Sequence, residues 1–302
     1  MSLAGFYFAL SVFCFIGTVA AVFQARKISH ASIPWFFLGW LFGELAPIHL
    51  LWQLGLTLLL AMTGDLDTAS GRQGLTLFVI SWLGLLHVQR LAMDSASVLS
   101  QALRDGLGNN YRGDIPQARQ GVLRDSISST EWLRPFKMPR DGVKVHRNIP
   151  YSDAGKRNLL DIYEPAQPRE GGFPVLLQVH GGGWMIGEKE QQALPLMYHL
   201  AQRGWLCVAI NYRLSPADAF PAHIIDVKKA IAWIRQNAAQ YGADPAYLAI
   251  TGGSAGGHLS SLAALTPNKA EWQPGFEDVD TSISAAVPFY GVYDFQDKAN
   301  IR

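Results

Sequence analysis

The sequence predicts an α/β domain with a mostly parallel sheet, preceded by an α-helical region that crosses a membrane. Three observations predict this organisation. Charged residues are scarce in the first 93 residues, long apolar stretches fill that region, and strand and helix patterns alternate after about residue 141. We therefore expect a transmembrane anchor of two or three helices over residues 1–93, a juxtamembrane connector over 94–140 and the N-terminal part of the α/β domain over 141–302.

The charges are distributed unevenly. The chain has 25 basic and 24 acidic residues in 302, or 16% charged, against roughly 25% in ordinary soluble domains. Only seven of these charges lie in residues 1–93. The formal net charge of +1 gives no reason to expect a nucleic-acid partner. Cys14 and Cys207 lie in apolar segments, so we interpret them as small buried hydrophobic residues.

Three apolar runs form the predicted anchor. Leu3–Phe23 has 21 residues and no charge, enough to cross a hydrocarbon core of about 30 Å. It lacks the basic start of a signal peptide and more apolar sequence follows, which indicates an uncleaved anchor. Ile33–Met62 contains Glu44 and Pro47, so we expect it to tilt, kink at Pro47 or extend past one face. Gly74–Met93 is the weakest run, and a buried helix of a soluble protein is its alternative.

Basic residues in short loops predict the orientation of the anchor. Arg26 and Lys27 mark the first loop as cytoplasmic. With three spans the chain re-enters the cytoplasm at Arg90 and the following domain is cytoplasmic, whereas two spans would place that domain outside. We expect an integral membrane protein with membrane lipid as a partner and with the domain that follows the anchor on the cytoplasmic side.

Strand and helix patterns follow one another along the rest of the chain. Ser95–Leu107 has apolar residues at helical spacing, which predicts an amphipathic juxtamembrane helix. A pair of strands and then an alternation of strands and helices predict a mostly parallel sheet with helices on both faces. The predicted strands are Val143–Tyr151, Leu159–Tyr163, Pro174–Val179, Trp205–Asn211, Tyr247–Thr251 and Ser284–Phe289, and the helices are Glu190–Arg203, His223–Tyr241 and one from Ala255.

Two glycine-rich motifs follow two of these strands. The first is His180-Gly181-Gly182-Gly183-Trp184, and the second, Gly252–Gly257, contains the pattern G-x-S-x-G around Ser254. That pattern alone should occur by chance in roughly one chain in ten of this length. Its place between a strand and a helix, with the first motif 74 residues upstream, makes the combination a strong signal for a serine nucleophile.

The geometry of such a turn explains its residues. A serine between strand and helix is held in a strained conformation that pushes its hydroxyl into a cleft. A Cβ at Gly252 or Gly256 would collide with neighbouring backbone, and the helix from Ala255 directs its free amides towards the reacting centre. The glycines of the first motif let backbone amides face the negative oxygen of a tetrahedral intermediate. Losing one such donor costs about 3–4 kcal/mol of transition-state stabilisation.

Each of these features has a structural alternative. Ser254 could cap a helix in an inert turn, and the first motif could be a plain turn or a phosphate-binding loop. His180 lies at the start of its own loop, so we expect it to orient that loop instead of acting as the base. His258 follows Ser254 by one helical turn and is interpreted as a packed structural histidine.

The motifs resemble a known family. Together with Asn211–Pro216, Phe220–Ala222 and Gly252–Leu259, they resemble the hormone-sensitive-lipase-like branch of the α/β-hydrolases. The form G-G-S-A-G-G-H-L is closer to bifunctional feruloyl/acetyl-xylan esterases and membrane-bound prenylcysteine methylesterases. The resemblance covers about Val143–Asp294.

The resemblance implies roles for individual residues. Ser254 would be the nucleophile, and the amides of Gly181, Gly182 and Ala255 would form the oxyanion hole. Supporting positions in the two motifs would be His180, Gly183, Gly252 and Gly256. Asp226 matches a position that we interpret as structural, near the start of a helix. No metal and no cofactor are expected.

The sequence departs from the family in the rest of the triad. In this family an Asp or Glu and then a His follow the nucleophile. Here only 48 residues follow Ser254, and no histidine occurs after His258. Among the acidic residues that follow, Asp294 is the least implausible triad acid. We therefore expect a C-terminally incomplete α/β-hydrolase fold whose triad acid and base are not in this chain, and a natural protein that continues for roughly 100 residues.

These expectations define a function. We expect a membrane-anchored serine hydrolase that cleaves carboxylic ester bonds of small or lipid-like molecules through an acyl-serine intermediate. An amidase such as a formamidase would use the same mechanism. A non-catalytic binding module of the same fold is the alternative from a different class.

Overall fold

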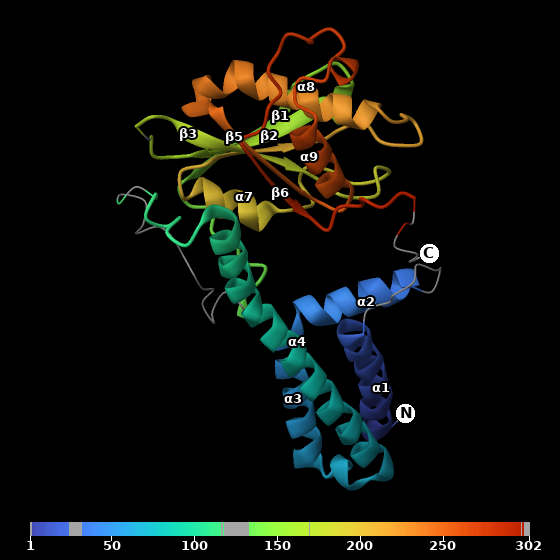
Figure 1. Cartoon of the computed structure of the whole chain (residues 1–302). Helices are drawn as coiled ribbons and strands as arrows, with labels where there is room; N and C mark the ends of the chain where they lie inside the picture. The colour runs from blue at the N-terminus through green and yellow to red at the C-terminus, as the bar shows by residue number, and fades with distance from the viewer. Residues whose placement is uncertain are drawn as a thin grey trace. The chain divides into compact units, whose positions relative to one another are not determined.

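The chain divides into two compact units in the computed structural model, which describes residues 2–23, 32–115, 117, 133–168, 170–296 and 298 (Figure 1). One unit comprises Met1–Pro135 with Asp297–Arg302, and the other is Phe136–Gln296. The predicted boundaries of anchor, connector and catalytic domain stay predictions. Arg26 and Lys27, on which the predicted orientation depends, and the middle of the predicted connector lie outside the described residues.

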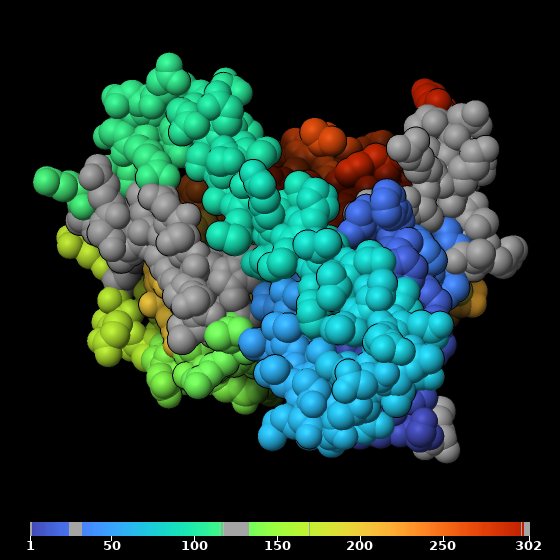
Figure 2. Space-filling view, turned by 90° about the horizontal axis from the view of Figure 1, so that it is seen from below, coloured from blue at the N-terminus to red at the C-terminus, as the bar shows by residue number. Residues whose placement is uncertain are grey.

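The first unit is helical. Its helices are α1 (Leu3–Val22), α2 (Ser32–Glu44), α3 (Ala46–Thr63), the 3₁₀ turn η1 (Asp65–Asp67) and α4 (Ala69–Leu107). Among the described residues, α1, α3 and α4 are long and apolar enough to cross a membrane, by length and composition. The space-filling view shows the residues of α3 and the first turns of α4, blue to cyan, lying against one another (Figure 2).

Local sequence explains where these helices begin and end. The Ser2 hydroxyl accepts a hydrogen bond from the Gly5 amide and caps α1. The second apolar run is broken at Leu45 instead of kinked at Pro47, because proline has no amide hydrogen and fits the first turn of a new helix. The predicted helix Ser95–Leu107 is not separate. It continues the third apolar run as the second half of the 39-residue helix α4.

Close contacts between helices hold the helical unit together. A Cβ on Gly74 would lie 2.6 Å from the ring of Tyr7, so α1 and α4 approach each other closely there. The Tyr7 hydroxyl and the Thr57 hydroxyl share a hydrogen bond of 2.8 Å, which joins α1 to α3. The Tyr7 ring also packs edge-to-face on Phe78 of α4. Small residues and interhelical hydrogen bonds of this kind are the contacts that hold helices together in lipid.

The second unit contains a six-stranded sheet. Its strands are β1 (Val143–Pro150), β2 (Leu159–Pro165), β3 (Phe173–Val179), β4 (Leu206–Ile210), β5 (Ala243–Gly253) and β6 (Ala285–Phe289), in the spatial order β1-β2-β4-β3-β5-β6. β1 and β2 are antiparallel to their neighbours, and β4, β3, β5 and β6 run parallel. The prediction of a mostly parallel sheet is confirmed.

Helices cover both faces of this sheet (Figure 1). α8 (Ala222–Asn237) and α9 (Ala255–Leu265) pack on one face, and α7 (Leu194–Ala201) packs on the other. The 3₁₀ turns are η2 (Gly155–Asn158), η3 (Ala238–Tyr241) and η4 (Ala270–Trp272). The residues of β4 are buried on both faces, as expected for a central strand of a parallel sheet.

Two predicted elements differ in extent. The helix expected at Glu190–Arg203 begins only at Leu194, where Pro195 occupies the first turn. The side chains of the preceding glutamines instead accept hydrogen bonds from loop amides, which keeps that segment out of the helix. The strand expected at Tyr247–Thr251 extends over Ala243–Gly253, because its pairing with β3 begins at Ala243.

Candidate active site

Ser254 lies on a sharp turn between β5 and α9. Its backbone angles, φ 54° and ψ −120°, are a strained conformation for a residue with a side chain. The Ser254 amide donates a hydrogen bond of 3.0 Å to the Phe289 carbonyl of β6. The His258 amide donates to the Ser254 carbonyl at 2.9 Å, which starts the helix. The turn is therefore fixed from both sides.

The glycines of this turn allow a close approach of backbone to backbone. A Cβ on Gly252 would lie 2.5 Å from the Val179 carbonyl oxygen of β3. A Cβ on Gly256 would collide with the carbonyl oxygens of Val179 and His180. Neither position can hold a side chain, which agrees with the expectation from the motif.

The first glycine motif lies directly beside this turn. A Cβ on Gly181 would lie 3.3 Å from the Ser254 Cβ and 2.6 Å from the Gly253 carbonyl oxygen. Gly182 and Gly183 have φ values of 125° and 60°, which favour glycine. The two motifs, 74 residues apart in the sequence, thus form one site.

The Gly181 amide is not available to a substrate in this structure. It donates a hydrogen bond of 2.7 Å to the Gln192 Oε1 atom, and Gly181 is buried. The expected place of Gly181 in an oxyanion hole stays a prediction, and this hydrogen bond argues against it. In the part of the chain that the structure describes, the amides of Gly182 and Gly183 have no protein acceptor. The Ala255 amide lies in the first turn of α9, where no intrahelical acceptor exists.

The two nearby histidines are in apolar surroundings. The His180 ring stacks on Tyr212 with ring centroids 4.4 Å apart, and its Nδ1 atom donates to the Gly181 carbonyl at 2.8 Å. Burial lowers the pKa of His180, so the ring is neutral at pH 7. His258 packs edge-to-face against Trp184 and Phe295, and burial lowers its pKa as well. Among the described residues, neither ring forms a hydrogen bond with Ser254.

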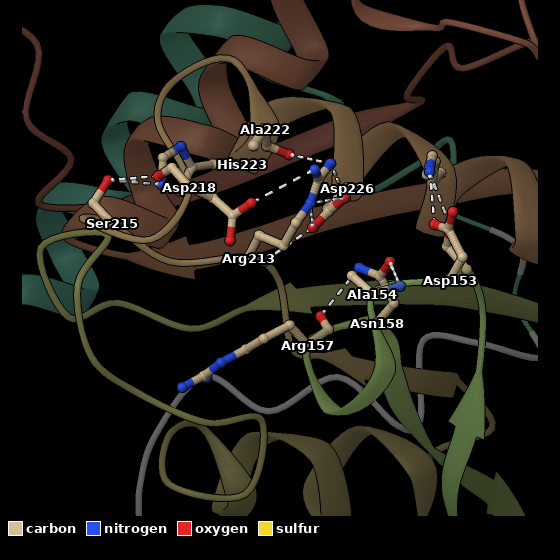
Figure 3. Close-up of polar contacts among 12 residues, drawn as sticks. Asp153, Ala154, Arg157, Asn158, Arg213, Ser215, Asp218, Ala222, His223 and Asp226 are labelled. Atoms are coloured by element: carbon tan, nitrogen blue, oxygen red, sulfur yellow. Dashed lines mark hydrogen bonds and ion pairs between the residues drawn. The ribbon is translucent and has the colours of Figure 1, made fainter.

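A polar cluster is formed by residues of the segment after β4 and of α8 (Figure 3). Arg213 follows β4 and holds the buried carboxylate of Asp226 through both of its oxygens, at 2.7 and 2.9 Å. The Ser215 amide donates to the Trp184 carbonyl at 2.8 Å, so this cluster supports the glycine loop. Asp226 is thus placed in α8 as a partner of Arg213, which agrees with its interpretation as structural.

One pair in this cluster has the composition of a nucleophile and a base. The Ser215 Oγ atom lies 3.2 Å from the His223 Nε2 atom, but it also donates to the Asp218 carbonyl at 3.0 Å (Figure 3). Because the hydroxyl has one proton, His223 must be the donor to Ser215. This contact therefore fixes the loop, and His223 does not act as a base for Ser215. Sequence reasoning did not single it out.

Removing the buried carboxylate should destabilise the fold. We expect Asp226→Ala to lower the free energy of unfolding by about 3 kcal/mol, because Arg213 and the Arg213 amide lose their acceptor. Thermal unfolding followed by circular dichroism measures this. Asp218→Ala is the matched control, since its carboxylate lies 3.8 Å from Arg213 and is partly exposed. Equal effects of the two variants would contradict this role of Asp226.

The chain is similar to several known proteins. Residues 160–302 match the family model described as BD-FAE. The chain is 44% identical to "Probable carboxylic ester hydrolase LipM" of Mycobacterium tuberculosis over 81% of this chain and 60% of that protein. It is 53% identical to "Esterase LipQ" of the same organism over 73% of this chain and 53% of that protein. A solved structure titled "Bifunctional GH43-CE Bacteroides eggerthii" is 32% identical, covers 52% of this chain and 24% of that one, and has a TM-score of 0.48.

The class of protein follows from the fold and the family match. A mostly parallel sheet with a serine turn after one strand and a glycine loop after its neighbour defines an α/β-hydrolase fold. The BD-FAE match and the esterase relatives support the resemblance to hormone-sensitive-lipase-like α/β-hydrolases that the motifs predict. It spans between one half and two thirds of the length of these two curated relatives.

Proposed function

We propose that this protein hydrolyses carboxylic esters through an acyl-serine intermediate on Ser254, in a membrane-anchored form. The observation that carries the proposal is the strained Ser254 turn beside the glycine loop, at the first turn of α9. An inert helix cap has no need of this strain, because a cap residue normally has ordinary β-region angles. The names of LipM and LipQ support the esterase activity.

The chemistry follows from the site. The Ser254 hydroxyl attacks the ester carbonyl carbon and its proton passes to a general base, while the carbonyl oxygen becomes negative. The amides of Gly182, Gly183 and Ala255 are proposed to donate to that oxygen. The alcohol leaves with a proton from the same base, and water then attacks the acyl-serine and releases the acid.

The acid and base are proposed to come from outside these 302 residues. In the described part of the chain, the Ser254 hydroxyl has no hydrogen-bond partner. The buried neutral ring of His180 is committed to the Gly181 carbonyl, and His258 is held between aromatic rings. A base acts from within hydrogen-bond reach of the nucleophile, and among the described residues neither histidine forms a hydrogen bond with the Ser254 hydroxyl.

A substrate panel tests the activity and its alternatives. The natural full-length protein in detergent should release p-nitrophenol from short-chain p-nitrophenyl esters faster than p-nitroaniline from the matching anilides. Faster cleavage of anilides or formamides would favour the amidase alternative. Binding of an ester without turnover would favour the non-catalytic module. The expected substrates are small or lipid-like esters, because the site lies in a protein with apolar helices.

Membrane insertion gives a separate prediction. α1, α3 and α4 have the length and composition of membrane spans, so the chain should sediment with membranes and leave them only in detergent. Alkaline carbonate and high salt, which release peripheral proteins, should leave it in the pellet. A variant from which residues 1–107 are deleted is the control and should lose this behaviour. Recovery of the intact chain in the soluble fraction after high-speed centrifugation would count against an anchor. The cytoplasmic location of the site remains part of this proposal.

A further inference from the structure

Two consecutive peptide groups of the glycine loop are held by side chains. The peptide between His180 and Gly181 is held at both ends: its carbonyl accepts from the Tyr212 hydroxyl at 2.9 Å, and its N–H donates to Gln192 Oε1 at 2.7 Å. The next peptide, between Gly181 and Gly182, is held at its carbonyl by His180 Nδ1 at 2.8 Å. Within the described residues only the Gly182 N–H of these two peptides lacks a partner.

The planarity of the peptide bond then fixes the direction of the Gly182 amide. In a trans peptide the N–H and the C=O point in opposite directions, so the Gly182 N–H points away from the His180 ring. The peptide between His180 and Gly181 cannot rotate without breaking its hydrogen bond to Gln192 or its hydrogen bond to Tyr212. It is also confined by the Gly253 carbonyl and the Ser254 side chain, which leave no room for a Cβ.

We infer that Gln192 is a positioning residue that sets the direction of the oxyanion-loop amides by accepting the Gly181 N–H. This inference rests on the proposed function. Gln192 reaches the loop from the turn that precedes α7, outside both glycine motifs. Without its acceptor the buried Gly181 amide would be left unpaired, which is costly, so the peptide would rotate towards another acceptor. The Gly182 amide would move with it.

A contrasting account makes a different prediction. If the Gly181 amide were itself an oxyanion donor, Gln192 would compete with the substrate for it. Removing the Gln192 acceptor would then leave turnover unchanged or raise it. The two accounts therefore predict opposite signs for one substitution.

The test compares three variants of the natural full-length protein. Gln192→Met keeps the length of the side chain and removes only its polar amide, and Gln192→Ala removes both. Gln191→Met is the matched control, because the neighbouring Gln191 accepts from the exposed Glu188 amide at 3.1 Å. We measure kcat and KM for p-nitrophenyl butyrate, together with the thermal midpoint of each variant.

Gln192→Met and Gln192→Ala should lower kcat by about 10- to 100-fold with KM within about threefold, because the lost interaction acts on the transition state. Gln191→Met should stay within about twofold of the parent. Should Gln192→Ala not fold, the length-matched Gln192→Met still decides. Unchanged or raised kcat in Gln192→Met, with turnover in the parent, would overturn the inference alone. A parent protein without turnover would overturn the proposed function as well.

Discussion

Replacing Ser254 with alanine should lower ester turnover of the full-length protein by about 10⁴-fold or more, because no nucleophile remains to form the acyl intermediate. Labelling by a fluorophosphonate probe should disappear in the same variant. The substitution removes only a hydroxyl that, in the described part of the chain, holds no other group. Circular dichroism and the thermal midpoint should therefore stay close to those of the parent.

Ser215 provides the control for this experiment. Its Oγ atom lies 3.2 Å from His223 Nε2, but its hydroxyl donates to the Asp218 carbonyl and its backbone is not in the left-handed region. Ser215→Ala should keep probe labelling and most of the turnover. Loss of labelling in Ser215→Ala with retention in Ser254→Ala would reverse the assignment. Wild-type turnover in Ser254→Ala would favour the binding-module alternative.

Gly182→Ala is expected to have the second largest effect. A Cβ at this position would collide with the Ile186 carbonyl oxygen, and φ of 125° is a conformation that alanine avoids. The loop must shift, which displaces an oxyanion donor without removing the nucleophile. Turnover should fall by about 100- to 1,000-fold. Ser254 should still react with the fluorophosphonate probe, but slowly.

Gly183→Ala separates this collision from a general intolerance of the loop. Gly183 has φ of 60°, and no atom lies within 4 Å of an added Cβ. Alanine there carries a strain of about 1 kcal/mol without a collision, so its loss of turnover should be much smaller. Thermal midpoints show whether either variant is unfolded. Equal losses in the two variants would contradict an origin in the Ile186 collision.

Much of the fold could be predicted because its signals are local. The continuous apolar run of β3 and the alternation of strands with helices predicted a mostly parallel sheet. The glycines around Ser254 predicted close backbone contacts, and the structure has them at Gly252 and Gly256. Each of these features leaves a pattern in neighbouring residues that the sequence displays directly.

The features that could not be predicted depend on contacts between distant segments. The partner of the Gly181 amide is a side chain eleven residues away, and nothing in the local pattern distinguishes Gln192 from Gln191. The predicted helix over that segment was wrong at its start for the same reason. The continuity of α4 was missed because a change from apolar to amphipathic composition was interpreted as a boundary. No glycine or proline, which would end a helix, lies near Asp94.

Ser254 should carry the acyl group during turnover, and mass spectrometry of the trapped intermediate can detect it there. The full-length protein is mixed with p-nitrophenyl butyrate, quenched in acid within the burst phase and digested. We expect a butyryl mass increase on the peptide that contains Ser254, absent from Ser254→Ala and present in Ser215→Ala. Butyrylation of another residue in the parent would contradict the assignment of Ser254. Rapid ester hydrolysis by Ser254→Ala would contradict it as well.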